Sequence, residues 1–148
     1  MTKYISLLNG PNLNLLGTRN PTQYGAATLD QIVHRVDEEA KKFGHTIWAF
    51  QTNSEGDLVD AIHKSVREAV GIIINPAAYS HTSVAIRDAL ECMAGPVIEV
   101  HLSNIAARED FRHHSFVSPV ASGVISGFGS HSYVLAVQAM AELLKRPV

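Results

Sequence analysis

Glu99 and His101 lie two residues apart in the apolar run 96–102. Residues at this spacing on a strand face the same side of a sheet, and a carboxylate in such a run must be paired if it is buried. A neighbouring carboxylate fixes the tautomer of an imidazole and favours its protonated form, which general acid catalysis requires. The two residues are therefore a candidate acid–base pair.

The other side chains that could do chemistry gather in three segments, each of which follows an apolar run. The first, residues 9–25, is long for a connection between a strand and a helix. The second covers residues 75–83 and the third residues 103–114. The connections that precede the apolar runs are short and plain. Amides, imidazoles and guanidiniums therefore gather where strands end, which predicts a site at that edge.

Two residues of the first segment have ordinary structural explanations. Asn12 in a loop is first of all a turn former. Tyr24 beside Gly25 is first of all a loop anchor, because a free phenol has a pKa of about 10 and is a poor base. Glycines at 10, 17 and 25 make residues 17–25 a candidate lid. These residues alone leave open whether the site only binds a ligand or also transforms it.

Apolar runs alternate with helical patterns along the chain. β-branched and apolar residues predict strands over residues 4–8, 45–51, 71–75, 96–102 and 120–126. Apolar residues at helical spacing predict helices over residues 28–43, 54–70, 82–93 and 132–145. Thr28 with Gln31 and Ser54 with Asp57 have the spacing of helix N-caps. A short helical turn is expected around residues 108–111.

This order of elements predicts an α/β fold with a parallel sheet, because right-handed crossovers place helices on both of its faces. We expect a flavodoxin-like, doubly wound sheet of five strands in the order 2-1-3-4-5. In such sheets a ligand binds beyond the carboxyl ends of the strands, at the switch point between strands 1 and 3. One domain over residues 1–148 accounts for the length.

Composition excludes several classes of protein. The 148 residues carry a net charge of −2, which gives no support for nucleic acid as the main partner. The longest apolar stretch, residues 69–74, is far too short to cross a membrane. The single Cys92 allows no internal disulfide; we expect it in the core, and we expect the protein in the cytoplasm. The eight histidines show no spacing typical of a zinc site.

Three stretches together resemble a known family. Residues 7–25 (LLNGPNLNLLGTRNPTQYG), 74–83 (INPAAYSHTS) and 99–105 with 108–114 (EVHLSNI and REDFRHH) resemble the type II 3-dehydroquinate dehydratases, in order and over essentially the whole chain. The resemblance implies trans elimination of water from 3-dehydroquinate through an enolate, giving 3-dehydroshikimate. It places the reaction in the shikimate pathway, which leads to chorismate and the aromatic amino acids, or in quinate use. It implies no metal, no cofactor and no Schiff-base lysine, and the lysines all lie outside the candidate loops.

The resemblance also assigns catalytic roles. Tyr24 matches the base that takes the proton next to the ketone, and the cation of Arg19 would favour the phenolate that this base requires. Asn12 matches the group that orients a water or stabilises the enolate oxygen. His101, held by Glu99, matches the general acid at the leaving hydroxyl.

The remaining assignments concern substrate binding and assembly. The residues that match substrate-binding positions are Asn75, His81, Asp88, Leu102, Ser103 and Arg112. The resemblance implies that Asp88 reaches the site of a neighbouring subunit, in a homo-oligomer built from trimers, as in the family's dodecamers.

Two other functions remain as alternatives. A flavodoxin-like domain that binds a small ligand without catalysis needs neither a base nor an acid, so the presence of Tyr24, Arg19, Glu99 and His101 argues against it. A nucleotide or phosphate binder needs a glycine-rich turn that opens directly into a helix. Here Gly10 leads instead into a long loop rich in Asn and Leu.

Overall fold

The chain is described by a computed structural model that covers residues 3–18 and 20–146, without the side chains of residues 21 and 23. Within these residues, five strands form one sheet in the order β2-β1-β3-β4-β5, and all neighbouring strands are parallel. This confirms the predicted flavodoxin-like sheet and its order. The strands are β1 (Tyr4–Asn9), β2 (Ile47–Gln51), β3 (Ala69–Asn75), β4 (Val97–His101) and β5 (Gly123–Ser126).

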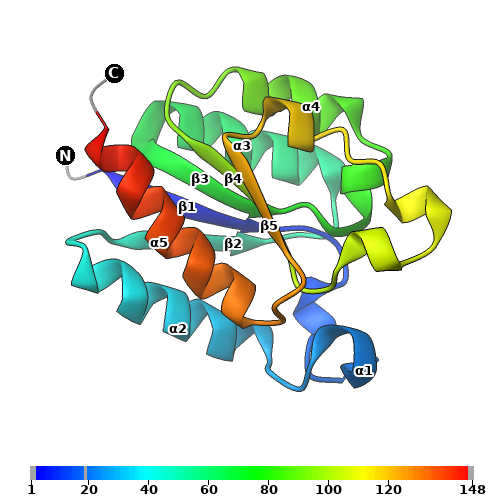
Figure 1. The fold of residues 1–148 in the computed structure, drawn as a ribbon. Coiled ribbons are helices and arrows are strands. Elements are labelled where there is room, and N and C mark those ends of the chain that lie inside the picture. The colour runs from blue at the N-terminus through cyan, green and yellow to red at the C-terminus, as the bar shows by residue number, and fades with distance from the viewer. Residues whose placement is uncertain (1–2, 19, 147–148) are drawn as a thin grey trace.

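Helices cover both faces of the sheet, as predicted. Figure 1 shows α2 and α5 on one face and α3 and α4 on the other, while the short α1 lies beyond the sheet, next to the loop that follows β1. The bounds of the helices in the described residues are α1 (Pro21–Tyr24), α2 (Leu29–Lys42), α3 (Glu55–Glu68), α4 (Val84–Glu91) and α5 (His131–Lys145).

The core has two halves because successive strand residues point to opposite faces. Ile5 and Leu7 of β1 pack with Val36 of α2 and Val137 of α5, and all four are buried. Leu8 of β1 packs with the residues of α3 and α4 on the other side. A sheet buried on both faces explains why its strands are nearly continuous apolar runs.

Both predicted helix caps are confirmed. The backbone N–H of Gln31 donates to Oγ1 of Thr28 at 3.2 Å, and the side chain of Gln31 accepts from the N–H of Thr28 at 3.0 Å. At α3, the N–H of Asp57 donates to Oγ of Ser54 at 3.2 Å. These side chains satisfy backbone donors that the first turn of a helix leaves unpaired.

Three local predictions are wrong. Ala69 does not end a helix; it begins β3, because its backbone pairs with Tyr4 of β1 and this long-range contact overrides the helical pattern. Residues 120–122 are not part of a strand, since a 3-10 helix, η5 (Ser118–Val120), precedes β5. Cys92 is exposed at the end of α4, outside the core.

The segments that follow the strands are built largely from short 3-10 helices. They are η1 (Leu13–Leu15) after β1, η2 (Ala77–His81) after β3, and η3 (Ile105–Ala107) and η4 (Asp110–Arg112) after β4. The turn expected around residues 108–111 is thus η4, shifted by about one residue, with η3 before it. Together these segments cover the carboxyl edge of the sheet.

Gly10 makes the join between the first and second of these segments possible. Its backbone N–H donates to the carbonyl of Asn75 at 2.8 Å. A Cβ atom on Gly10 would lie only 2.5 Å from the carbonyl oxygen of Pro76. A side chain is therefore excluded where the loops after β1 and β3 meet.

Candidate active site

A cavity of about 250 Å³ lies at the carboxyl edge of the sheet, where the loops after β1, β3 and β4 meet. This is the switch point of a sheet in this order, because β1 and β3 are neighbours whose connections run in opposite directions. The cavity is lined by Pro11, Asn12, Leu13, Tyr24, Asn75, Ala77, Ala78, His81, His101, Leu102, Ser103, Ile105, Arg108 and Arg112.

Most of the predicted site residues therefore lie together. Eight of them line this one cavity: Asn12, Tyr24, Asn75, His81, His101, Leu102, Ser103 and Arg112. Glu99 lies behind His101, and Asp88 is exposed on α4 and does not line the cavity. Arg19 lies outside the described residues, so its predicted contact with Tyr24 stays a prediction.

Glu99 and His101 form the pair that their spacing predicts. Nε2 of His101 lies 2.5 Å from Oε2 of Glu99, and the exposed fractions of the two residues are 5% and 0%. Because Nε2 faces the carboxylate, Nδ1 is the ring nitrogen left for a ligand in the cavity. The ring therefore lies between a buried carboxylate and the candidate site.

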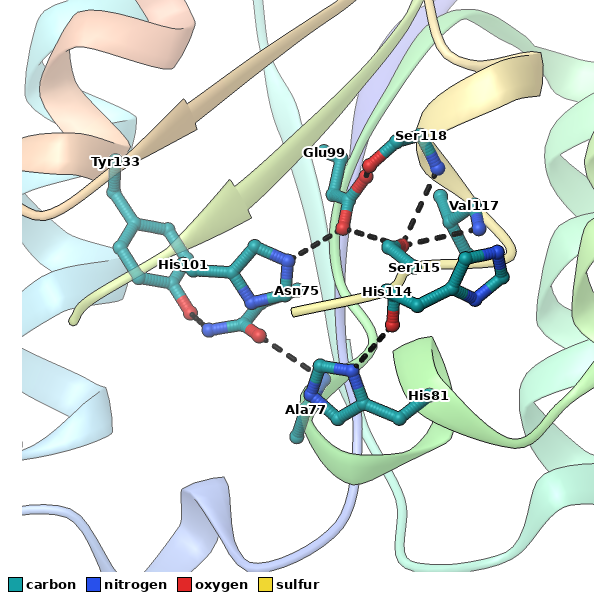
Figure 2. A network of polar contacts seen from close by, with 10 residues as sticks. All are labelled: Asn75, Ala77, His81, Glu99, His101, His114, Ser115, Val117, Ser118 and Tyr133. Carbon is teal, nitrogen blue, oxygen red and sulfur yellow. Dashed lines mark hydrogen bonds and ion pairs between the residues drawn. The ribbon is translucent and has the colours of Figure 1, made fainter. Parts of the chain in front are cut away.

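Two serines from the loop before β5 complete the environment of this carboxylate. Ser115 donates to Oε2 of Glu99 at 2.8 Å, and Ser118 donates to Oε1 at 2.5 Å (Figure 2). Sequence analysis missed both serines, since they are common loop residues 16 and 19 positions after Glu99. Only the folded chain brings their hydroxyls to the carboxylate.

These contacts explain the ionisation of Glu99. Burial by itself raises the pKa of a carboxyl, because it disfavours the charged form. The hydrogen bond and positive charge of His101 and the two serine hydroxyls outweigh burial, and they hold the pKa of Glu99 below its ordinary value. Glu99 is therefore a carboxylate that can hold a protonated His101.

Tyr24 meets an arginine that sequence analysis gave no role. Nη2 of Arg108 donates to the Tyr24 hydroxyl at 3.2 Å, and the guanidinium carbon lies 5.4 Å from the centre of the ring. Nη1 of the same side chain donates to Oγ of Ser103 at 3.1 Å. The two contacts tie the α1 segment to the loop after β4. Arg108 was visible only as one of several polar residues in that loop.

The loop that carries Asn12 is held by residues at the end of β2. Asn12 has a φ of 70°, in the left-handed region that asparagine adopts more readily than most residues. Its backbone N–H donates to Oδ1 of Asn53 at 3.0 Å, and Gln51 donates to the carbonyl of Gly10 at 3.1 Å. Asn12 is thus fixed at the rim of the cavity by groups outside it.

Two other cavity residues are oriented by neighbours in the loop after β4. Nδ1 of His81 lies 2.8 Å from the carbonyl oxygen of His114, which leaves Nε2 for a ligand. Nε of Arg112 is paired with the carboxylate of Glu109. Both side chains are therefore positioned before any ligand binds.

Among the residues that the structure describes, no group of three or more His, Cys, Asp or Glu could hold a metal ion. None of the helices in the same ranges is long and apolar enough to span a membrane.

The fold and the site define a doubly wound α/β protein with a polar cavity at its switch point, lined by ionisable side chains such as Tyr24 and His101. The sequence matches the family "Dehydroquinase class II" over residues 3–141. The chain belongs to this family.

Relatives match along nearly the whole chain. The 3-dehydroquinate dehydratase of Hahella chejuensis is 60% identical over 136 residues, which are 91% of this chain and 92% of that protein. The 3-dehydroquinate dehydratase 2 of Pseudomonas aeruginosa is 56% identical and covers 96% of each chain. The crystal structure of the type II dehydroquinase from Propionibacterium acnes superimposes with a TM-score of 0.91 at 46% identity, over 96% of this chain and 98% of that one.

Proposed function

We propose that this chain is a 3-dehydroquinate dehydratase, a hydro-lyase that removes water from 3-dehydroquinate to form 3-dehydroshikimate. One observation carries the proposal: Tyr24, its arginine and His101 line the same cavity, and the carboxylate of Glu99 lies behind His101. Binding alone needs neither group, whereas elimination needs a base at carbon and an acid at the leaving oxygen. The family and its named relatives support the same reaction.

Tyr24 acts as the base in this proposal. The phenolate takes a proton from the carbon next to the ketone, and the electron pair left behind forms an enolate. A guanidinium that donates to the phenol oxygen stabilises negative charge there, and an arginine does not lose its own proton while doing so. Arg108 supplies that contact at 3.2 Å. We propose that Arg19 adds a second cation.

His101 acts as the acid that completes the elimination. When the enolate collapses, the carbon–oxygen bond breaks, a carbon–carbon double bond forms, and His101 gives a proton to the departing hydroxyl, which leaves as water. Glu99 stabilises the protonated ring that this step requires. Asn12, at the rim of the same cavity, stabilises the enolate oxygen or orients a water beside it.

The substrate is held by the other groups around the cavity. We propose that Asn75 and the main chain of Leu102 and Ser103 bind its carboxylate and nearby hydroxyls, and that His81 and Arg112 bind hydroxyls on the ring. We also propose residues 17–25 as a lid, since this segment carries Tyr24 on α1 and has glycines with φ of 92° and 82° at its ends. The whole chain then acts as a single catalytic domain.

Assembly and location complete the proposal. We propose a trimer-based homo-oligomer, a dodecamer in full, in which Asp88 reaches a neighbouring site; its exposure on α4, away from the cavity of its own chain, supports this. With one cysteine in 148 residues, the chain is suited to the cytoplasm. The reaction serves chorismate and aromatic amino acid biosynthesis through the shikimate pathway, or the use of quinate.

The test is the ultraviolet absorbance of the conjugated enone that elimination creates, followed after 3-dehydroquinate is added to purified protein. Tyr24→Phe removes the base and almost no volume, so we expect kcat to fall by about 10³-fold or more. Binding of 3-dehydroquinate, measured by calorimetry, should change by less than about threefold.

Two outcomes would count against this proposal in different ways. Wild-type protein that binds the substrate without forming the enone would support the non-catalytic ligand-binding alternative. Near-normal turnover by Tyr24→Phe would leave the reaction in place but remove Tyr24 as the base.

Phe128→Leu is a control, because Phe128 is exposed and does not line the cavity; its turnover should stay at the wild-type level.

A further inference from the structure

A chain of three buried polar side chains connects the cavity to α5. Asn9 ends β1, Asn75 ends β3, and Tyr133 lies in the first turn of α5, with exposed fractions of 1%, 3% and 0%. The Tyr133 hydroxyl donates to Oδ1 of Asn9 at 2.7 Å, and Nδ2 of Asn75 donates to the Tyr133 oxygen at 2.9 Å. Of the three, only Asn75 lines the cavity, so the other two can act on a ligand only through it.

A backbone donor fixes the direction of this chain of hydrogen bonds. The N–H of Ala77 donates to Oδ1 of Asn75 at 3.1 Å (Figure 2). If the amide of Asn75 were turned over, its NH₂ group would meet this N–H, and two donors would face each other. The oxygen of Asn75 therefore points to Ala77 and its nitrogen to Tyr133.

The Tyr133 hydroxyl has the right donor and acceptor for both of its asparagine partners. A hydroxyl has one proton, and because Tyr133 gives it to Asn9, its oxygen is left to accept from Asn75. Burial raises the pKa of the Tyr133 phenol, so the proton stays in place. Within the described residues, Nδ2 of Asn9 is buried without a hydrogen-bond partner. Asn9 thus keeps its oxygen toward the phenol even though its own nitrogen is left unpaired.

We propose that Tyr133 is a positioning residue that fixes the amide of Asn75 with one N–H directed at the substrate. With Oδ1 bound to Ala77 and one hydrogen of Nδ2 bound to Tyr133, the second hydrogen of Nδ2 is the donor that Asn75 has left to offer. The site then presents a donor at this point and selects an acceptor oxygen, such as a carboxylate. This inference rests on the proposed function, because it concerns binding of the same substrate.

The backbone at Ala77 supports a functional reading of this arrangement. Ala77 has a φ of 53°, in the left-handed region that alanine seldom adopts. Such conformations persist only where the surrounding structure enforces them, and they gather at ligand sites. Here the conformation belongs to the residue whose N–H sets the orientation of Asn75.

The principal test is Tyr133→Phe, which removes one oxygen and keeps the ring. Without the phenol, one hydrogen bond no longer holds the plane of the Asn75 amide, so we expect KM for 3-dehydroquinate to rise about tenfold. We expect kcat to stay within about threefold, because the proton-transfer groups are untouched. A merely structural role would lower the amount of folded enzyme, and with it the apparent kcat, without this selective rise in KM.

A matched control and a double variant isolate the route through Asn75. Tyr4→Phe also removes a phenol hydroxyl, one that donates to Glu68 at 2.6 Å at the opposite end of β1, and its KM should be unchanged. Asn75→Ala should raise KM by itself. Adding Tyr133→Phe to Asn75→Ala should then raise KM no further, since Tyr133 has lost the group through which it acts.

If Tyr133→Phe does not fold, Asn9→Leu carries the same test, since it removes the acceptor of the phenol proton at similar volume. A KM within twofold of wild type in a folded Tyr133→Phe or Asn9→Leu variant would overturn the proposal, as would a full additional rise in the double variant. Failure of wild-type protein to form the enone would instead contradict the proposed function. The two failures are therefore distinguishable.

Discussion

At the scale of single residues, the proposed site contains pairs in which one member faces the cavity and the other member holds it in place. His101 faces the cavity with Glu99 behind it, and Tyr24 faces it with Arg108 at its hydroxyl. Ser115 in turn holds Glu99, because its hydroxyl donates to the carboxylate and is itself fixed by the backbone N–H groups of Val117 and Ser118. A buried carboxylate whose oxygens are all engaged is stable as an anion.

This environment makes a prediction about stability and pH. The pKa of Glu99 is lower in the folded chain than in the unfolded chain, where it is about 4.3. Ionised Glu99 therefore stabilises the fold above that value, and the contribution is lost as pH falls through the folded-state pKa. Urea denaturation at pH 5, 4 and 3 should show a steeper loss of unfolding free energy in the wild type than in Glu99→Gln.

An exposed glutamate provides the comparison for that measurement. Glu142 lies on the solvent side of α5, so Glu142→Gln should keep the wild-type dependence on pH. Identical slopes for wild type and Glu99→Gln would contradict the assignment of Glu99 as a stabilising buried anion. Glu99→Gln should also be less stable at pH 7, by about 1–3 kcal/mol, because the neutral amide loses the charge-assisted hydrogen bonds that His101 and the two serines make with the carboxylate.

At the scale of elements, the carboxyl edge of the sheet is assembled by close contact between loops. Gly10, directly after β1, donates to Asn75 at the end of β3 and leaves no space for a Cβ atom against Pro76. Both contacting groups belong to the backbone, so neither can rotate away. This contact sets how close the loop of Asn12 lies to the loop of His81, and both residues line the cavity.

Gly10→Ala should therefore be destabilising even though the change is only one methyl group. We expect a loss of about 1–3 kcal/mol from overpacking, and about 2–4 °C in melting temperature for each kcal/mol. A thermal melt measures it. The KM for 3-dehydroquinate should rise as well, because the two loops are forced apart.

Gly56→Ala is the matched control for this change. Gly56 lies in the first turn of α3, where an added Cβ atom would meet nothing closer than Oγ of Ser54 at 3.9 Å. Alanine favours helix over glycine by about 0.5–1 kcal/mol, so this variant should be as stable as the wild type or more stable. If both variants changed the melting temperature equally, the close contact between Gly10 and Pro76 would not be what destabilises Gly10→Ala.

At the scale of the whole molecule, the proposed oligomer is tested by mixing two inactive variants. If Asp88 serves a neighbouring site, Asp88→Ala chains still carry an intact Tyr24, and Tyr24→Phe chains still carry an intact Asp88. Co-refolded trimers would then contain about one quarter of sites with both groups, by random mixing of two chains. Activity should return in the mixture although each variant alone is inactive.

The control is the double variant that carries both changes in one chain, mixed with wild type. Its own sites lack Tyr24 and it supplies no Asp88, so it should only lower the wild-type activity. No recovery in the first mixture, with mixed trimers verified by mass spectrometry, would place Asp88 at its own chain's site, whereas full activity of Asp88→Ala alone would place it outside catalysis. Sedimentation of the wild type then tests the trimer and dodecamer directly.

The sequence by itself determined the elements whose causes are local. The caps at Thr28 and Ser54 and the alternating apolar runs depend on neighbours within a few residues, so the pattern carries the information. The parallel sheet with helices on both faces followed from the handedness of crossovers, and its strand order was expected because it is a common order of doubly wound sheets. The pairing of Glu99 with His101 was also predictable from local sequence, because residues two apart on a strand point to the same face of the sheet.

Only the tertiary structure decided the contacts between residues far apart in the sequence. Arg108 meets Tyr24 across 84 positions, and Tyr133 meets Asn75 across 58. Ala69 joins a strand instead of a helix because Tyr4 pairs with it. Such contacts depend on how whole elements pack against one another. A local sequence pattern therefore cannot predict which distant residue will be the partner.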